Sequence, residues 1–288
     1  MLNVLVAGCG YVGCVLGERL AMRGHRVHGM RRDPAGLPKC VHPIAADLND
    51  PASLARLPVD LNAVCYTASA GAQTPDAYRA AYVEGLVNLT DAFRRQGQAI
   101  QRVLFASSTG VYHQTGGEWL DEDSPARATS FSSEILLEGE ERVLRGPFPA
   151  TVVRFSGIYG PGRTRVIDEV LAGKARRYAE RTVYLNHIHR DDAASVLEHL
   201  LTLGTARDRY VATDDEPVER SVALRWIAGR LGLPEPPLAA PVLGDAPRRG
   251  ANRRYRNARL RATGFSFAYP TYREGYGALI AARNGVQP

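Results

Sequence analysis

Short apolar runs alternate with longer segments of helical periodicity along the first 155 residues of the chain. The apolar runs have the length of strands and are bounded by turn residues, as buried strands are. Between them, apolar residues recur three and four positions apart, which is the spacing of a helix with one buried face. We therefore predict strands over Asn3–Ala7, His25–Met30, Val41–Ala45, Leu61–Thr67, Arg102–Ser107 and Ala150–Phe155, and helices over Val12–Met22, Pro75–Gln96 and Ser130–Arg145.

This order of elements predicts the fold class. Strands and helices that alternate in sequence form an α/β fold with a doubly wound parallel sheet. Ligands of such sheets bind outside the carboxyl ends of the strands. We therefore expect one cleft to be lined by the turns that follow Ala7, Met30, Thr67, Ser107 and Phe155.

Beyond Phe155 the alternation loosens, and a second, smaller domain is expected. We predict a loop over Gly157–Arg163, a strand over Arg209–Thr213, and helices over Arg165–Leu171, Ala193–Leu203 and Ser221–Leu231. Residues 1–155 would form the first domain, completed by about 184–213. Residues 156–183 and 214–288 would form a smaller, interleaved domain on the substrate side. The chain shows no internal repeat.

The turn after the first strand reads Gly8-Cys9-Gly10-Tyr11-Val12-Gly13, with the spacing GxGxxG. Its first glycine allows a tight turn, its second lets a pyrophosphate approach the backbone, and its third lets the next helix pack closely on the strand. The N-terminus of that helix favours an anion. We predict a dinucleotide site here, and the alternative is an ordinary glycine-rich turn. The turn residues assigned to it are Gly8, Gly10, Tyr11, Val12 and Gly13.

The end of the second strand, Met30-Arg31-Arg32, bears on the choice of cofactor. An acidic residue at this place binds the ribose hydroxyls of NAD, whereas the 2′-phosphate of NADP needs cationic partners. Arg31 and Arg32 therefore favour NADP(H), and Asp33 is close enough to keep NAD(H) open. The alternative interpretation is a pair of solvated surface arginines.

Three further strand ends supply candidate cofactor contacts. Asp47 and Leu48 close the third strand, where an Asp can reach an adenine amino group. Thr67 and Ala68 close the fourth strand, and the small residues that follow would let the backbone lie close to the cofactor. Ser107 ends the fifth strand and completes the predicted cofactor set.

The net charge of +6 and the pI near 9.3 raise the question of nucleic-acid binding, because basic proteins gain affinity for polyanions. The arginines are scattered along the chain rather than arranged along one helix, so we exclude nucleic acid as a partner. One dense basic run spans Arg248–Arg256. It would either bind a phosphorylated ligand or form a solvated face, and we favour the solvated face.

Membrane and metal functions are also excluded by the sequence. No apolar run approaches the roughly 20 residues that span a bilayer. The chain enters a strand at once, without the charged first region of a signal peptide, so we predict a cytoplasmic protein with no membrane partner. The cysteines form no CxxC pair, and no histidines cluster at zinc-ligand spacing. We predict no metal and four reduced, mostly buried thiols: Cys9, Cys14, Cys40 and Cys65.

Five segments together resemble the extended short-chain dehydrogenase/reductase superfamily, in the group of NAD-dependent epimerase/dehydratases. They are Gly8–Gly13, Ser107–Tyr112, Arg154–Arg163, Ile188–Asp192 and Tyr269–Gly275. The resemblance covers nearly the whole chain. It implies a Rossmann-type sheet that holds a nicotinamide cofactor, and a C-terminal region that binds the substrate, commonly a nucleotide-linked sugar.

The sequence departs from the family pattern twice. Extended members typically carry GxxGxxG after a Thr, whereas GxGxxG after Ala7 is similar to atypical members. In active members a Tyr-x-x-x-Lys pair exchanges the proton, because the lysine lowers the pKa of the tyrosine. The matching positions here hold Ser132 and Leu136, and neither Lys39 nor Lys174, the only lysines, forms such a pair.

What the resemblance leaves for catalysis is Ser108, which matches the Ser or Thr that hydrogen-bonds the substrate oxygen. A serine alone is a poor general base, so another group must move the proton. Tyr112, His113, Glu134 and Tyr159 are the candidates, and we take Tyr112 and Glu134 forward as catalytic residues.

The predicted substrate contacts are Ser108, Gly157, Tyr159 and Arg163. Arg163 follows a Gly-Pro-Gly turn and would bind an anionic part of the substrate, and its alternative role is to support the domain interface. We expect His189 and Asp192 to be structural anchors, since Asp191 and Asp192 also lie where a helix N-cap belongs.

Two functions from different classes remain. The first is an atypical NAD(P)(H)-dependent reductase, epimerase or dehydratase that acts on a small hydroxy- or keto-bearing substrate, such as one resembling a nucleotide sugar. The second is a non-catalytic NADP(H)-binding regulatory or sensor protein, favoured by the loss of both Tyr and Lys. Ser108 and the full-length substrate region favour the enzyme. A small molecule is the expected partner, and a homodimer stays open.

Overall fold

A computed structural model describes residues 1–178, 182–239 and 252–285 of the chain. The chain divides into two compact units. The first unit contains residues 1–113, 125–155 and 193–210, and the second unit contains residues 114–124, 156–192 and 211–288. Each unit is therefore built from segments that are far apart in the sequence.

A seven-stranded sheet forms the centre of the first unit, and its strand order is β11-β7-β5-β4-β1-β2-β3. Every pairing from β7 to β3 is parallel, which confirms the predicted doubly wound parallel sheet. Its chain order runs outward in both directions from β1, so the carboxyl ends of β1 and β4 lie side by side at the switch point. The strands are β1 Asn3–Ala7, β2 Arg26–Arg31, β3 His42–Ala45, β4 Ala63–Tyr66, β5 Arg102–Ser108, β7 Ala150–Phe155 and β11 Arg209–Ala212.

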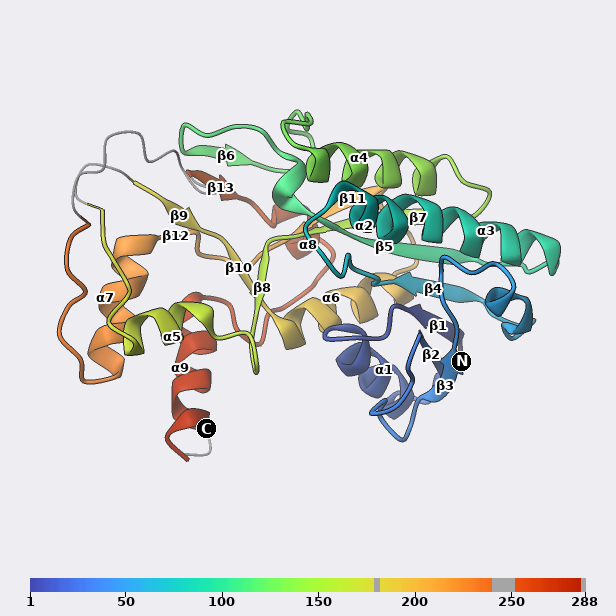
Figure 1. Ribbon diagram of the computed structural model, residues 1–288, viewed down its shortest axis with the longest axis horizontal. Helices are drawn as coiled ribbons and strands as arrows, with labels where there is room; N and C mark the ends of the chain where they lie inside the picture. Colours follow the sequence, from blue (N-terminus) through green and yellow to red (C-terminus); the bar gives the residue numbers. More distant parts are fainter. Residues whose placement is uncertain (179–181, 240–251, 286–288) are drawn as a thin grey trace. The chain divides into compact units, whose positions relative to one another are not determined.

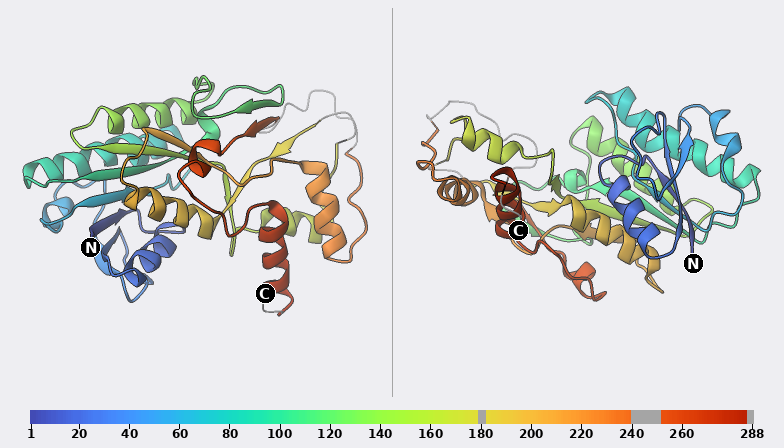
Figure 2. Two further views of the ribbon diagram at one scale, coloured as in Figure 1. Left: turned by 180° about the vertical axis from the view of Figure 1, so that it is seen from behind. Right: turned by 90° about the horizontal axis from the view of Figure 1, so that it is seen from below.

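Helices cover both faces of this sheet. On one face lie α1 (Gly13–Met22) and α6 (Arg190–Thr202), joined by an ion pair of 2.7 Å between Arg19 and Glu198. The other face carries α4 (Phe131–Leu144) and the helical segment of residues 75–95, and both views from front and back show this division (Figures 1 and 2). Two 3₁₀ turns, η1 (Ser53–Arg56) and η3 (Thr109–Val111), complete the unit.

The helix predicted over Pro75–Gln96 is interrupted, which corrects the prediction. It consists of α2 (Pro75–Arg79), a π-helical turn η2 (Ala80–Glu84) and α3 (Gly85–Arg95). The buried Tyr66 hydroxyl donates a hydrogen bond of 2.6 Å to the Ala81 carbonyl oxygen inside this turn. A side chain outside the helix thus takes up one of its carbonyl groups, which is a recognised cause of such irregular turns. The apolar spacing of the sequence does not contain this information.

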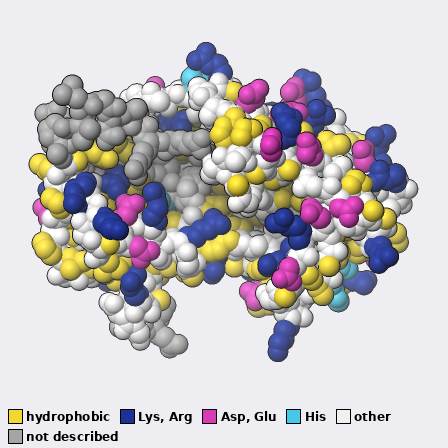
Figure 3. Space-filling model, viewed as in Figure 1, with side chains coloured by type: hydrophobic (Ala, Val, Ile, Leu, Met, Phe, Trp, Pro, Cys, Tyr) yellow, Lys and Arg dark blue, Asp and Glu magenta, His cyan; other side chains and the backbone are white. Residues whose placement is uncertain are grey.

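Charged side chains of both signs are intermixed on the face of the molecule that Figure 3 shows. Ion pairs along α4 illustrate the pattern, because Glu138 pairs with Arg142 at 3.1 Å and Glu141 pairs with Arg145 at 2.8 Å. The excess of arginine over acidic residues is therefore spread over the visible surface rather than concentrated in one stripe.

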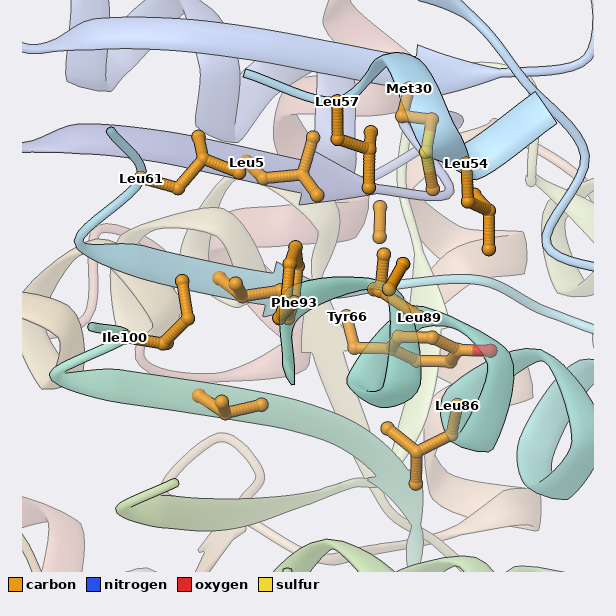
Figure 4. Packing of buried hydrophobic residues seen from close by; sticks show 14 of the residues in the cluster. Leu5, Met30, Leu54, Leu57, Leu61, Tyr66, Leu86, Leu89, Phe93 and Ile100 are labelled. Atoms are coloured by element: carbon orange, nitrogen blue, oxygen red, sulfur yellow. The ribbon is translucent and has the colours of Figure 1, made fainter. Parts of the chain in front are cut away.

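A hydrophobic core of the first unit lies between the sheet and the helices α3 and α4 (Figure 4). Successive residues of β1 point to opposite faces of the sheet, so Leu5 faces this core while Val6 lies on the side of α1. All five residues of β1 are buried, as expected for a strand that is covered on both faces. Core members labelled in Figure 4 include Leu5, Met30, Leu54, Tyr66, Leu86, Leu89 and Phe93.

The second unit contains three two-stranded sheets and four helices among its described residues. The loop predicted over Gly157–Arg163 begins with a strand, because Gly157–Tyr159 pairs in parallel with His187–His189. The C-terminal region, which gave no clear helical signal, forms a capped helix whose first turn is closed by Thr271 and Glu274. The elements are β6 Glu118–Leu120, β8 Gly157–Tyr159, β9 Tyr184–Leu185, β10 His187–His189, β12 Val218–Glu219, β13 Arg253–Tyr255, α5 Arg165–Leu171, α7 Arg220–Arg230, α8 Ala258–Arg261 and α9 Tyr272–Arg283.

The basic run near the C-terminus is only partly described, since Arg248 and Arg249 lie outside the described residues. Within the described part, Arg253 is buried, with 7% of its surface exposed. The Arg254 guanidinium stacks on Trp119 and donates hydrogen bonds to the Gly117 carbonyl oxygen. Arg253 is buried in β13, which pairs with β6, and Arg254 packs on that strand, so the expected solvated face is wrong for these two residues.

Candidate functional site

A pocket of about 450 Å³ lies in the first unit at the carboxyl ends of β1, β2, β3 and β4. This is the edge of a parallel sheet at which ligands bind. The alanine-rich segment that includes Ala77, Ala80 and Ala81 forms another part of its wall. Seven residues predicted from the sequence as cofactor contacts line this pocket: Gly8, Gly10, Arg31, Arg32, Asp47, Leu48 and Ala68.

Gly8 closes the turn between β1 and α1 and cannot carry a side chain. Its φ is +80°, and a Cβ atom would lie 2.4 Å from the backbone of Ala68. The backbone N–H groups of Gly8 and Cys9 both donate to the carbonyl oxygen of Met30, at 3.0 and 2.9 Å. The turn is therefore fixed against the neighbouring strand and against the segment after β4.

Gly10 leaves open space in the pocket wall. A Cβ atom at this position would meet only the Gly8 carbonyl oxygen, 3.8 Å away. The protein itself does not need glycine here for packing, so the missing side chain leaves room for something else. A phosphate that approaches the backbone is the ligand for which this arrangement is known in dinucleotide turns.

Gly13 and Thr67 support the turn from behind. A Cβ atom on Gly13 would lie 3.0 Å from both Val6 and the Thr67 hydroxyl, which fits the predicted role of close packing between helix and strand. The Thr67 hydroxyl donates to the Gly8 carbonyl oxygen at 3.0 Å. Gly13 is not part of the pocket lining, and neither are four other predicted cofactor residues: Tyr11, Val12, Thr67 and Ser107.

Arg31 and Arg32 make one edge of the pocket electropositive. Arg31 is half-buried and Arg32 is exposed, and neither forms an ion pair with any residue that the structure describes. The Asp33 carboxylate forms a local contact, because it accepts a hydrogen bond of 2.9 Å from the Ala35 backbone N–H. Asp33 is also absent from the pocket lining, so the charge presented to a ligand at this edge is positive.

Asp47 and Leu48 line the pocket after β3, the strand that pairs with β2. The Asp47 carboxylate accepts a hydrogen bond of 2.9 Å from the Asn49 backbone, which holds the residue at the strand end. The Leu48 carbonyl oxygen accepts a hydrogen bond of 2.9 Å from the Asn88 side chain of α3. Both residues are therefore positioned by local structure before any ligand arrives.

A buried network of charges stands behind the end of β5. The Ser107 hydroxyl donates to Glu140 of α4 at 2.6 Å. Arg154 of β7 donates to both carboxylate oxygens of Glu140, at 2.6 and 3.0 Å, and a further nitrogen of Arg154 donates to the Tyr112 hydroxyl at 3.0 Å. All four side chains are buried. The network joins α4, β5 and β7 directly behind the segment that contains Ser108.

Glu140 and Arg154 were missed as site residues by the sequence reasoning. A signal was present for Arg154, which is the one charged residue in the apolar strand β7, but not for Glu140, whose neighbours in α4 are also charged. Charged residues are almost never fully buried unless they are paired. The pairing partner of each could not be read from the sequence, because 14 positions separate the two.

The structure places the three predicted catalytic residues in different surroundings. The Ser108 hydroxyl accepts a hydrogen bond of 3.0 Å from the Gly110 backbone at the start of η3, and Ser108 is half-buried. Tyr112 is 1% exposed, and its hydroxyl accepts the hydrogen bond from Arg154. Glu134 lies exposed in the first turn of α4, the helix that packs against η3.

Leu136 is the residue that the sequence resemblance expects at the place of a lysine. It is buried, with 5% of its surface exposed, and belongs to the face of α4 that packs on the sheet. The hydroxyl of Ser132, which the resemblance expects at the place of a tyrosine, lies 3.0 Å from the hydroxyl of the N-cap Ser130. This turn of α4 thus carries serine hydroxyls and an apolar side chain.

The predicted substrate residues of the second unit are of two kinds. Gly157 and Arg163 are exposed, and the backbone N–H of Arg163 donates to the Gly160 carbonyl oxygen at 2.9 Å within a tight turn. Tyr159 belongs to the core of this unit, and its ring lies so close to Gly275 that no side chain fits there. Burial, and then the nearby Asp214 carboxyl, raise the pKa of Tyr159 far above its usual range. A buried phenol of this kind is a poor proton carrier.

Asp192 acts as a structural anchor of the second unit, as expected. Its carboxylate accepts hydrogen bonds of 2.8 Å from the backbone of both Ala268 and Tyr269. The expected N-cap position is wrong, because α6 begins at Arg190 and both Asp191 and Asp192 lie inside its first turn. The buried His189 ring packs on Tyr269, at 3.9 Å between ring centroids.

Two features of the described residues bear on other classes of function. None of the helices in this part of the chain combines the length and the apolar character needed to cross a bilayer. The same residues hold no cluster of three or more His, Cys, Asp or Glu side chains that could bind a metal ion. A separate hollow of about 440 Å³ between α3 and α4 is lined partly by charged side chains, such as Glu138 and Arg142, and lies away from the strand ends.

Comparison with known proteins gives relatives in one family. The model of the NAD-dependent epimerase/dehydratase family matches residues 4–212. A 3-beta-hydroxysteroid dehydrogenase of Mycolicibacterium neoaurum is 28% identical over 248 residues, which is 75% of this chain and 66% of that protein's length. A dTDP-L-rhamnose 4-epimerase of Burkholderia thailandensis is 25% identical over 304 residues, covering 81% of this chain and 82% of that protein.

Solved structures with a similar fold were also found among known proteins. One from Methylobacillus flagellatus, assigned by its name to the NAD-dependent epimerases/dehydratases, is 37% identical with a TM-score of 0.81, over 98% of this chain and 99% of that chain. The same fold occurs in the UDP-glucose 4-epimerase of Thermus thermophilus in complex with NAD, at 21% identity and a TM-score of 0.79, covering 98% of this chain and 99% of that chain. It also occurs in a human epimerase family protein with NADPH, at 20% identity and a TM-score of 0.78, covering 96% and 98%. With its glycine turn, its parallel sheet and the match over residues 4–212, this chain belongs to the NAD-dependent epimerase/dehydratase family.

Proposed function

We propose that the pocket of the first unit binds NADP(H) in preference to NAD(H). The pyrophosphate would lie on the turn Gly8–Gly13, where Gly10 leaves space beside the backbone. Arg31 and Arg32 would hold the 2′-phosphate, since guanidinium groups bind phosphate with charge-assisted hydrogen bonds. The adenine would lie towards Asp47 and Leu48. Solved structures of this fold hold either NAD or NADPH, so the arginine pair is the feature that favours NADP(H).

The cofactor would supply hydride transfer, and this chain would supply the positioning of the substrate and its proton. We infer an atypical oxidoreductase, epimerase or dehydratase that acts on a small hydroxy- or keto-bearing substrate. Ser108 would hydrogen-bond the substrate oxygen from the end of β5. Glu134 is the exposed ionisable group on the first turn of the neighbouring helix and would carry the proton.

Tyr112 has a different part in this proposal. Its hydroxyl is buried and bound by Arg154, so it would hold the segment of Ser108 rather than exchange protons with solvent. In the second unit, the exposed Arg163 would bind an anionic group of the substrate. Gly157, the first residue of β8, would contact the substrate from the same segment. The named relatives, a steroid dehydrogenase and a sugar-nucleotide epimerase, differ in substrate, so the substrate class is proposed at the level of a hydroxyl or carbonyl group.

A non-catalytic NADP(H)-binding protein is the second candidate. The observation that favours it is the buried Leu136 at the position of the family's lysine. An alkyl side chain stabilises neither a phenolate nor a ribose contact, and general acid–base help is typically worth roughly 10²–10⁴ in rate. The protein would then bind the cofactor and leave the reaction to others.

The observation that carries the proposal is the convergence of the glycine turn and the two arginines on one pocket at the strand ends. Calorimetric titration of the full chain with NADPH, NADP, NADH and NAD tests the binding part. We expect saturable binding with the phosphorylated forms preferred, and the absence of binding by all four would overturn it.

The catalytic part is tested by a panel of ketones, aldehydes and nucleotide sugars with NADPH, and of the corresponding alcohols with NADP. Turnover that is lost in Ser108→Ala supports the enzyme. Tight binding without turnover of any member of the panel supports the non-catalytic protein instead.

A further inference from the structure

Two of the four cysteines lie at the glycine turn itself. Cys9 is buried between Gly8 and Gly10, and Cys14 is half-buried in the second position of α1. The Cys14 thiol donates to the Cys9 carbonyl oxygen at 3.5 Å. The two thiols also hydrogen-bond to each other, and this contact is the largest of the effects that raise the pKa of Cys9, ahead of its burial. The turn thus brings two thiols into contact with only four residues between them.

We propose that Cys9 and Cys14 are an oxidation site, at which hydrogen peroxide forms a disulfide that weakens nucleotide binding. In the first step the Cys14 thiolate attacks one peroxide oxygen and the O–O bond breaks; a sulfenic acid forms, and the departing hydroxide takes up the proton that the Cys14 thiol released, which gives one water. In the second step the Cys9 thiol attacks the Cys14 sulfur, the S–O bond breaks, and the departing hydroxide takes up the Cys9 proton, which gives a second water. Two thiols lose two electrons and two protons, and one peroxide is reduced to two waters.

The surroundings assign the two roles. Cys14 is partly accessible and lies in the first turn of a ten-residue helix, where the helix dipole favours a negative charge. Cys9 has no exposed surface, and its raised pKa makes it a poor first nucleophile. It is nevertheless in contact with Cys14, which is the arrangement of a resolving cysteine.

The disulfide would change the pocket. A disulfide joins its sulfur atoms at about 2.05 Å, much closer than two thiols in contact, so the Cys9 and Cys14 sulfurs must approach each other. The Cys9 sulfur now fills the space beside Gly29, where a Cβ atom would lie 3.0 Å from it. The Cys9 backbone N–H donates a hydrogen bond to the Met30 carbonyl oxygen, and Cys9 is part of the pocket lining. The approach of the two sulfurs would therefore strain the turn on which the pyrophosphate would lie.

The remaining cysteines provide controls. Cys40 is exposed in the loop before β3, and Cys65 is fully buried in β4. Exposure alone would make Cys40 the most readily oxidised thiol. If oxidation of Cys40 lowers the affinity for nucleotide, the effect of oxidation is general. If oxidation of Cys14 lowers it, the effect comes from the glycine turn.

The experiment uses the full chain, reduced and then treated with hydrogen peroxide, as wild type, Cys14→Ser and Cys40→Ser. The first tryptic site follows Arg19, so both cysteines fall in one peptide, residues 1–19. In the oxidised wild type we expect this peptide to be lighter by two hydrogens and resistant to alkylation until dithiothreitol is added. A peptide 1–19 with two alkylatable thiols after treatment overturns the proposed site.

Affinity for NADPH is then measured on the same samples. We expect oxidation to weaken binding about tenfold or more in wild type and Cys40→Ser, with recovery on reduction and with no change in Cys14→Ser. An equal loss in Cys14→Ser overturns the link between the disulfide and the pocket. By reciprocity, saturating NADPH should disfavour the disulfide of the wild type at equilibrium with a thiol redox buffer.

Only the effect on affinity rests on the proposed function. If the reduced protein binds no nucleotide, the proposed function fails while the mass of peptide 1–19 still decides the cross-link. If the reduced protein binds NADPH and the cross-link does not form, the proposed function stands and this inference fails.

Discussion

Gly8 and Gly10 are both glycines of one turn, but the structure gives them different reasons to be glycine. A Cβ atom on Gly8 would overlap the Ala68 backbone at 2.4 Å, whereas one on Gly10 would meet nothing closer than 3.8 Å. We expect Gly8→Ala to destabilise the fold by at least about 2 kcal/mol, through the clash and the positive φ. We expect Gly10→Val to fold normally and to lose nucleotide binding.

Thermal unfolding and calorimetric titration separate the two effects. A Gly10→Val protein that is folded and keeps its affinity would mean that the sequence motif is only a turn. A Gly8→Ala protein with unchanged stability would contradict the geometry of the turn.

Arg31 and Arg32 are expected to set the preference between the two nicotinamide cofactors. Two arginines that pair with a partly exposed phosphate give on the order of 1–3 kcal/mol, or about 5- to 150-fold in affinity. The double variant Arg31→Ala/Arg32→Ala should lose this preference for NADPH over NADH, and its affinity for NADH should change little. Arg95→Ala, an exposed arginine on α3 outside the pocket, is the matched control. Equal affinities for both cofactors in the wild type would refute the assignment.

His187 is expected to make the protein sensitive to acid. Burial lowers the pKa of His187 to about 4 in the folded protein, against about 6.5 in the unfolded chain. Between pH 6.5 and 4 the unfolded chain therefore binds a proton that the folded protein does not, so stability falls as the pH falls through this window. The loss between pH 7 and 4.5 amounts to about 2–3 kcal/mol from this residue.

Urea unfolding at several pH values measures this effect. His187→Gln, whose amide can replace the contact with the Tyr276 hydroxyl, should lose less stability than the wild type on acidification. The exposed His42→Gln should follow the wild type. Parallel curves for His187→Gln and the wild type would show that this histidine does not titrate as argued.

At the scale of elements, the local pattern of the sequence predicted the strands of the sheet and most of the helices that cover it. β1 and β7 begin and end at the predicted residues, because each is an apolar run bounded by turn residues. The pocket edges at Arg31 and Asp47 were predictable for the same reason, since strand ends of a parallel sheet must meet. What could not be predicted depends on distant contacts: the π-turn held by Tyr66, the strand β8 that needs β10, and the pair of Glu140 with Arg154.

The ion pair of Glu140 and Arg154 is expected to be essential for the packing of α4 on the sheet. Both side chains are buried, with 1% and 3% of their surfaces exposed. Removal of one partner leaves a buried charge without compensation, at a cost of about 3–5 kcal/mol. Glu140→Gln should therefore lower the free energy of unfolding by about 3 kcal/mol, whereas the neighbouring exposed Glu141→Gln should change it by less than about 1 kcal/mol. A loss of the same small size in both variants would refute the argument.

At the scale of the whole molecule, the choice between enzyme and binding protein depends on how a proton moves beside the nicotinamide. We propose that the buried Leu136 stands at the helix position of the family's lysine. Ser132→Tyr/Leu136→Lys would restore the family's pair on the same turn. We expect this double variant, if α4 is in the inferred register, to gain reductase activity towards simple carbonyl compounds with NADPH, within the roughly 10²–10⁴ that acid–base help provides.

The single variants Ser132→Tyr and Leu136→Lys serve as controls, because the pair acts as a unit. Each alone should give little gain. Fast reduction of the same carbonyls by the wild type, unaffected by Ser108→Ala, would contradict both the register and the assigned site. A folded double variant that binds NADPH and shows no gain would argue that the substrate region does not present a carbonyl to this helix.

The π-turn η2 separates two functions within one helical segment. Each residue of an α-helix turns the direction of its side chain by about 100°, so the wider π-turn shifts the helical phase of everything before it. Ala77 and Ala80 consequently face the pocket, while Leu86 and Leu89 beyond the turn face the core. Removing one residue from this turn would restore a continuous helix and present different side chains to the pocket. A change of chain length at 80–84 can thus exchange the pocket wall while the core packing of α3 stays in place.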